Sequence, residues 1–204
     1  MPPLRIAYEP LSMARWAGLF QVLHLERPDL LFEWDAVPFP TAERPLLDGA
    51  DVGLFVEPPD EAGVSTLALD SSPMVVTMAV GHPLARREEL SIADVLGEPF
   101  PGGPNHHPGW RSFWTLDEHR GGPPETIDEA RDFATGLDLV ASGRAIATLP
   151  AAVANELPHP GVIAILLSDG PQVTTRLVWR SQETNPGVLS LVSIATEMTG
   201  CRRK

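Results

Sequence analysis

Segments with the composition of strands and segments with the spacing of helices alternate from the start of the chain. Residues 4–8, 30–34 and 50–56 are short runs rich in aliphatic and aromatic side chains, which favour strands. Between the first two runs, apolar residues recur at helical spacing over residues 13–25, and Pro28 ends that helix. Strands that alternate with helices over short links form a parallel sheet with right-handed crossovers. The sequence therefore predicts an α/β fold.

A second group of elements has equally clear turn and helix signals. Residues 74–80 form an apolar strand pattern that leads into a Gly-His-Pro turn at 81–83. Ser91 and Asp94 have the spacing of a capping box at the start of a short helix. We expect Gly97 to stop this helix in the left-handed conformation. Each piece is ordinary, but their order is specific.

That order resembles the effector-binding domain of LysR-type transcriptional regulators. In this family a strand, an HPLA turn and a short helix ending in GEPF recur, as they do in this chain over residues 74–100. The run from Asp138 to Pro150 is also similar to the family, because a helix, a Gly143 stop and a G-I-A-L-L-P-like strand follow one another. The resemblance covers essentially the whole chain.

The resemblance implies a fold of two Rossmann-like α/β lobes joined by two crossover strands, the type 2 periplasmic binding protein fold. We expect residues 1–72 and 164–204 to form lobe I and residues 73–163 to form lobe II. The strand at 162–167 would carry the chain back to lobe I. The family's N-terminal winged helix-turn-helix is missing from this sequence, so any DNA contact would be made only through that missing domain.

Composition limits the partners of the chain. Its net charge is −12, and its one basic cluster is the tail at residues 202–204. Because DNA binding draws on clustered Lys and Arg, the chain should not bind DNA by itself. No apolar run approaches the roughly 18 residues of a membrane span. The single cysteine, Cys201, and a strand that begins at once, which leaves no room for a leader, favour a cytoplasmic location.

Ligands of open parallel sheets bind at the carboxyl ends of the strands. That rule, together with the family resemblance, places an effector site in the cleft between the two lobes. Helix starts at Ser12 and Thr41 would offer hydroxyl and backbone donors, although both hydroxyls could simply cap their helices. A ring for stacking would come from Trp110. The predicted effector-binding residues are Ser12, Thr41, Phe55, Asn105, His107 and Trp110.

Two features depart from the family pattern. The loop at 104–110 contains histidines and a tryptophan where the family often has Ser or Thr. Glu9 and Glu57 follow strand ends and would repel an anion, so we expect an effector that is not a simple dianion. The alternative is that both carboxylates point into solvent on their loops. Adjacent histidines at 106 and 107 chelate poorly, and we predict no metal, no cofactor and no catalytic residue.

On the family resemblance, we interpret the chain as an effector-sensing regulatory domain rather than an enzyme. Its partners would be a small-molecule effector and a second copy of the chain, as a homodimer or higher homo-oligomer, with no membrane. The surplus of apolar residues on the helix at 13–25 and the edge strand at 30–34 would form the dimer surface. Two alternatives remain: a solute-binding receptor of a transport system with the same fold, and a dehydratase-like enzyme acting on a carboxylic acid.

Overall fold

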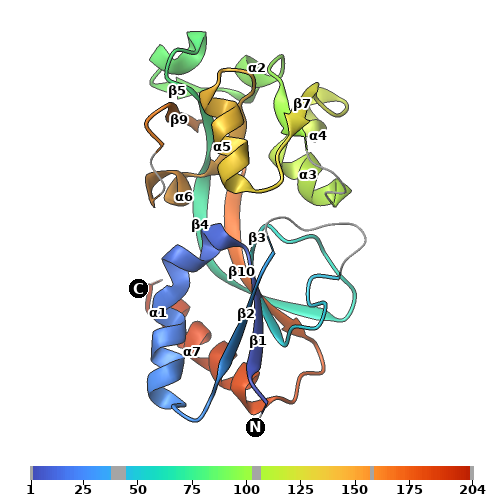
Figure 1. Ribbon diagram of the computed structural model, residues 1–204, viewed down its shortest axis with the longest axis vertical. Coiled ribbons are helices and arrows are strands. Elements are labelled where there is room, and N and C mark those ends of the chain that lie inside the picture. The colour runs from blue at the N-terminus through green and yellow to red at the C-terminus, as the bar shows by residue number, and fades with distance from the viewer. Residues whose placement is uncertain (1, 38–44, 103–106, 157–158, 203–204) are drawn as a thin grey trace. The chain divides into compact units, whose positions relative to one another are not determined.

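The computed structural model describes residues 2–37, 45–102, 107–156 and 159–202. The chain divides into two compact units (Figure 1). Among the described residues, the first unit comprises 2–37, 45–71 and 174–202. The second comprises 72–102, 107–156 and 159–173.

The first unit is built on a mixed sheet with the strand order β2-β1-β3-β10. Strand β1 (Leu4–Tyr8) lies parallel to both β2 (Phe32–Ala36) and β3 (Val52–Val56). Strand β10 (Gln172–Arg180) pairs with β3 in the antiparallel direction. The predicted parallel arrangement of the first three strands is confirmed. Their carboxyl ends therefore meet at one edge of this sheet.

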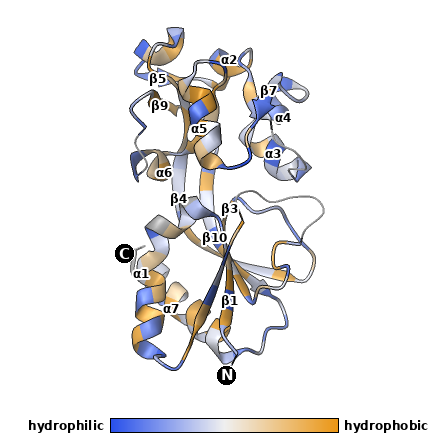
Figure 2. Cartoon of the chain, in the orientation of Figure 1, coloured by the Kyte–Doolittle hydropathy of each residue, from blue (hydrophilic) through white to orange (hydrophobic). Residues whose placement is uncertain are grey.

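Two long helices pack on one face of this sheet, α1 (Pro10–Glu26) and α7 (Pro186–Arg202). Helix α1 carries hydrophobic and hydrophilic residues around its circumference (Figure 2), and its apolar side chains pack with those of β1, β3 and α7. This cluster includes Trp16, Leu19, Leu23, Leu191 and Ile194, all buried. Burial stabilises such a face by about 25 cal/mol for each Å² of apolar surface removed from water.

The opposite face of the sheet is covered by a smaller buried cluster. Phe55 of β3 and Val178 of β10 are fully buried there, together with Ala7, Val37, Leu46, Leu47 and Ala50. Gly53 is required beside them, because a Cβ at this position would lie 2.3 Å from the Phe55 ring. The packing of Phe55 thus depends on a residue without a side chain two positions earlier.

The second unit is organised around the distal part of β4 (Val64–Ala79). Residues 74–77 of β4 pair with β8 (Ala147–Pro150) and residues 75–79 pair with β9 (Val162–Leu167), both antiparallel. Strand β5 (Glu89–Leu90) adds to β9 in parallel. Strands β6 (Phe100–Gly102) and β7 (Thr126–Glu129) form a separate parallel pair. The helical elements of this unit are η1 (Pro83–Arg86), α2 (Ile92–Val95), α3 (Pro108–Trp114), α4 (Asp117–Arg120), α5 (Phe133–Ala141) and α6 (Ala151–Glu156).

The α/β class and the two crossover strands are confirmed, but the return crossing differs from our expectation. Strand β4 runs from the first unit into the second, and β10 runs back across the boundary between Val173 and Thr174. We expected this role for residues 162–167. Those residues instead form β9, whose backbone is paired with β4 inside the second unit. The lobe boundary at residue 164 therefore has to move toward the C-terminus.

The local signals of the second unit are mostly confirmed. The Asp94 carboxylate accepts hydrogen bonds from the backbone N–H of Ser91 (2.9 Å) and from its hydroxyl (2.7 Å), which completes the capping box. Gly143 has φ +75°, as a left-handed helix stop requires. The prediction for Gly97 is wrong, because α2 ends at Val95 with Leu96 as a right-handed C-cap, and Gly97 does not adopt a positive φ.

Candidate functional site

The carboxyl edge of the first sheet is occupied by Glu9, which stands between β1 and α1. Its side chain is 5% exposed, and Oε2 accepts a hydrogen bond from the Val56 N–H at 3.0 Å. Its own N–H donates to the carbonyl of Leu54 at 3.0 Å. The other carboxyl oxygen, Oε1, is buried and has no hydrogen-bond partner among the described residues. Glu9 therefore ties the start of α1 to the end of β3.

Burial raises the pKa of Glu9 from 4.5 to about 8, while the hydrogen bond from the Val56 N–H acts in the opposite direction. At neutral pH the group is mainly a protonated carboxylic acid. In that form it can donate a hydrogen bond as well as accept one. The alternative that Glu9 points into solvent is wrong, because its carboxyl group is enclosed at the strand ends. Its repulsion of an anionic ligand disappears with its charge.

Ser12 lies in the first turn of α1 and is 2% exposed. Its hydroxyl is within hydrogen-bond distance of two carbonyl oxygens, that of Glu9 at 2.7 Å and that of Leu54 at 3.0 Å. With one proton, the hydroxyl donates to one of them at a time and keeps its own lone pairs. Ser12 is not the cap of α1, since Glu9 is in the N-cap position. Its hydroxyl links α1 to β3.

Glu57 follows β3 in the same way that Glu9 follows β1, but it is only half-buried. Its backbone has φ +45°, a left-handed conformation that is uncommon for a residue with a side chain. Two hydrogen bonds hold it there: its N–H donates to the Thr174 carbonyl at 3.0 Å, and its Oε1 accepts from the Thr174 N–H. The alternative that Glu57 simply points into solvent is therefore wrong as well.

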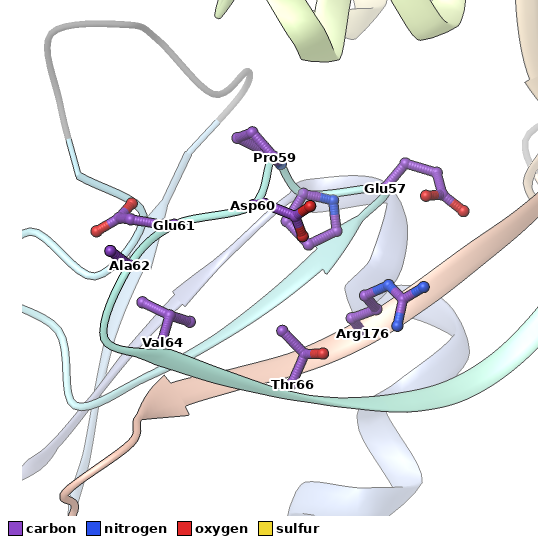
Figure 3. A pocket seen from close by; sticks show the side chains of 9 residues that line it. Glu57, Pro59, Asp60, Glu61, Ala62, Val64, Thr66 and Arg176 are labelled. Atoms are coloured by element: carbon purple, nitrogen blue, oxygen red, sulfur yellow. The ribbon is translucent and has the colours of Figure 1, made fainter.

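A pocket of about 670 Å³ opens beside Glu57 in the first unit (Figure 3). Its wall is formed by the segment that follows β3, by the start of β4 and by one residue of β10. The Glu57 and Arg176 side chains lie on one side of it in Figure 3. The lining residues are Glu57, Pro58, Pro59, Asp60, Glu61, Ala62, Val64, Thr66 and Arg176.

The second unit presents an aromatic group on α3. The rings of Trp110 and Trp114 are 6.0 Å apart, and Phe113 meets Trp114 edge-on at 5.1 Å. His107 occupies the N-cap position of α3 without a capping hydrogen bond from its side chain. Its Nδ1 is buried and has no hydrogen-bond partner among the described residues. The half-buried rings of this group offer stacking surface, and His107 offers a polar atom beside them.

Comparisons with known proteins decide the family. The model of the LysR substrate binding domain matches residues 2–199. The chain belongs to the LysR substrate-binding domain family. This result confirms the resemblance carried by the strand, HPLA turn and GEPF run.

Curated relatives of this LysR substrate-binding domain are transcriptional regulators. The chain is 30% identical over 189 residues to the HTH-type transcriptional regulator IlvR of Caulobacter vibrioides, covering 83% of this chain and 62% of the relative. It is 24% identical over 181 residues to the Hca operon transcriptional activator HcaR of Escherichia coli, covering 86% of this chain and 60% of the relative. The chain thus spans about three fifths of the length of these relatives.

The fold agrees with that of solved LysR effector domains. The structure of the BenM effector binding domain with its effector benzoate matches with a TM-score of 0.76 at 18% identity, covering 98% of this chain and 93% of that one. At this level of identity the likeness shows the shared fold. It supports the two-lobed architecture independently of the sequence motifs.

The predicted site residues lie in different surroundings in this LysR domain. Ser12 lies in the first turn of α1, and His107 and Trp110 lie at the start of α3. Phe55 is fully buried in the smaller cluster, so its ring has no surface for a ligand. Thr41 and Asn105 lie outside the described residues.

Two features of this edge were missed by sequence reasoning. The sequence predicts Glu9 either as a charged group that repels anions or as a solvent-facing carboxylate, whereas it is the buried N-cap of α1. Arg176 is not among the predicted site residues, because its place at the pocket depends on the pairing of β10 with β3. Among the described residues, no group of three His, Cys, Asp or Glu side chains could hold a metal ion. In the same part of the chain, no helix has the length and apolarity needed to cross a membrane.

Proposed function

We propose that this chain is the effector-sensing regulatory domain of a LysR-type transcriptional regulator. The observation that carries the proposal is the match of the LysR substrate binding domain over nearly the whole chain. The curated relatives IlvR and HcaR are both transcriptional regulators, and the BenM domain binds benzoate as its effector. Neither a transport receptor nor an enzyme is favoured by these relatives.

The proposed effector contacts are Ser12 in the first unit and His107 and Trp110 in the second. Thr41 and Asn105 remain proposed contacts outside the described residues, and Phe55 acts through packing alone. Because Glu9 is mainly protonated at neutral pH, it adds a neutral donor beside Ser12. This chemistry suits an effector with an aromatic or apolar body and a single polar or anionic group. An effector that binds two conformations of the domain unequally shifts their populations, and we propose this shift as the signal.

We propose that the signal passes through a homodimer. The first unit leaves large apolar side chains in solvent around α1 and β2: Leu25 is 79% exposed, Leu31 67% and Trp34 40%. Among the described strands, β2 is also the edge strand of its sheet. A second copy would cover both features in one two-fold contact. Binding to DNA, in a cytoplasmic setting, would be the task of a separate DNA-binding domain, since this chain carries a net charge of −12.

A thermal-shift screen of small aromatic acids, amines and neutral aromatics tests the proposed function. A true effector raises the melting temperature in proportion to its saturation. The Ser12→Ala and Trp110→Ala variants should each weaken binding of that effector by about tenfold. Ser65→Ala is the matched control, because Ser65 lies at the start of β4 and its exposed hydroxyl bonds the hydroxyl of Ser181. Equal binding of the effector by all variants would reject the proposed contacts, and the absence of any stabilising compound would reject effector sensing.

A further inference from the structure

The pocket beside Glu57 has a mixed charge that the proposed effector function does not use. Three acidic residues line it, Glu57, Asp60 and Glu61, of which the carboxylates of Glu57 and Glu61 already accept backbone hydrogen bonds, and one basic residue does, Arg176. The remaining wall is largely apolar and comes from Pro58, Pro59, Ala62 and Val64. A cavity of this size lies within the range of about 300–1,000 Å³ that small-molecule sites occupy.

Arg176 is positioned by the register of the sheet. It lies directly opposite Phe55 on the antiparallel strand β3, and it shares a face of β10 with Val178, two residues further on. Phe55 and Val178 are fully buried in one cluster, so the row of apolar side chains on this face ends in a guanidinium at the pocket. Within the described ranges, the Arg176 side chain makes no hydrogen bond or ion pair. A half-buried guanidinium without a partner is ready to bind an anionic group.

Glu57 is held in place next to this guanidinium. Its left-handed backbone is fixed by the two hydrogen bonds with Thr174, which lies two residues before Arg176 on the same strand. Its Oε1 accepts a hydrogen bond from the Thr174 N–H, and in Figure 3 its carboxylate points away from Asp60. Among the described residues, the Glu57 carboxylate and the Arg176 guanidinium therefore line the pocket without forming an ion pair with each other.

The charged residues of the pocket disfavour a ligand that carries only negative charge or only positive charge. A simple anion that binds Arg176 also meets the repulsion of three carboxylates, and a simple cation meets the guanidinium. A molecule with both charges a few bonds apart places its carboxylate on the planar fork of Arg176 and its ammonium near Asp60. We propose that this pocket binds a free α-amino acid, with its side chain against the apolar wall of Pro58, Pro59 and Val64. This site lies within the first unit and does not depend on the proposed effector contacts.

Calorimetric titration of the purified chain with glycine, L-valine, L-leucine and L-phenylalanine tests this proposal. We expect at least one of the amino acids with an apolar side chain to bind. N-acetyl-L-leucine, which lacks the ammonium, and L-leucine amide, which lacks the carboxylate, should bind at least about tenfold more weakly than the free amino acid. The Arg176→Gln and Asp60→Asn variants should weaken binding of the free amino acid by a similar factor. Both replace charges on the pocket wall while keeping a polar side chain of similar size.

Arg180→Gln is the control, because Arg180 lies on the same strand but contacts Leu47 and Glu183 outside the pocket. It should bind the amino acid as the unmodified chain does, and Arg176→Gln should retain any effector binding that depends on Ser12 and Trp110. The proposal is overturned if no amino acid binds up to about 10 mM, where affinity would be too weak to signify a site. It is equally overturned if either analogue binds as tightly as the free amino acid, or if Arg176→Gln changes nothing.

Discussion

Glu9 and Glu57 follow neighbouring strands of one sheet, β1 and β3, and yet their surroundings differ sharply. Glu9 is enclosed by α1 and β3, and burial raises its pKa to about 8. Glu57 is half-buried at the mouth of a pocket, bonded to Thr174 and close to Arg176. The topological position is the same, so the difference comes from what covers each residue. The edge of this sheet can thus offer a neutral donor at one strand end and a half-buried, hydrogen-bonded carboxyl group at another.

The largest expected effect concerns the pH dependence of stability at Glu9. Because the folded pKa is raised from 4.5 to about 8, the folded chain retains a proton that the unfolded chain releases. The stabilisation is complete below about pH 4.5 and is lost as the pH rises to about 8, by roughly 4 kcal/mol. Glu9→Gln cannot ionise and should lose this dependence. Urea unfolding of both proteins at several pH values measures the difference.

Glu57→Gln is the control for that experiment, because it replaces the carboxylate at the neighbouring strand end and leaves Glu9 unchanged. Its unfolding free energy should follow the pH profile of the unmodified chain, with the decline between pH 4.5 and 8 intact. If the free energy of unfolding of Glu9→Gln fell with pH just as that of the unmodified chain does, the raised pKa of Glu9 would be contradicted.

A smaller effect is expected from the hydrogen bond that fixes Glu57. Glu57→Ala removes the acceptor of the Thr174 N–H and should lower the free energy of unfolding by about 1–2 kcal/mol. Glu57→Gln retains an acceptor and should cost less than half as much. Chemical denaturation at neutral pH compares the two variants. If the free energy of unfolding fell equally in Glu57→Ala and Glu57→Gln, the charge of Glu57, rather than its hydrogen bond, would hold the left-handed turn.

The smallest effect is expected at Ser12. Ser12→Ala removes a buried hydroxyl, but the carbonyls of Glu9 and Leu54 keep the N–H donors of Ser12 and Glu9. The cost to stability should be about 1 kcal/mol. Ser65→Ala, whose hydroxyl is exposed, should cost only a few tenths of that amount. Thermal unfolding of the two variants side by side checks the order.

Local patterns were sufficient for most elements of the fold. The strand at Leu4–Tyr8, the capping box of Ser91 and the stop at Gly143 depend on residues a few positions apart, and the structure has all three. The return crossing is misplaced because residues 162–167 and 174–180 both have the composition of strands. Only long-range pairing with β4 shows which of them stays in the second unit.

The candidate site was less predictable than the fold. The strand-end rule led to Glu9, Ser12 and Glu57, but a residue's place after a strand does not say whether its side chain is covered. The burial of Glu9 depends on α1 and β3 closing over it, and the burial of Phe55 depends on the space left by Gly53. Arg176 enters the pocket through its register with Phe55, which no local pattern contains.

The most direct test of the contrast between the two strand ends is a carbon-13 NMR titration of the glutamate side-chain carboxyl carbons, with Glu9 assigned by comparison with Glu9→Gln. The prediction is a single resonance, absent from the variant, that keeps the chemical shift of a protonated carboxylic acid at about pH 6 and titrates with a midpoint near 8. A Glu9 resonance that titrates near 4.5 would contradict the account, since the carboxyl group would then be charged and open to solvent at neutral pH.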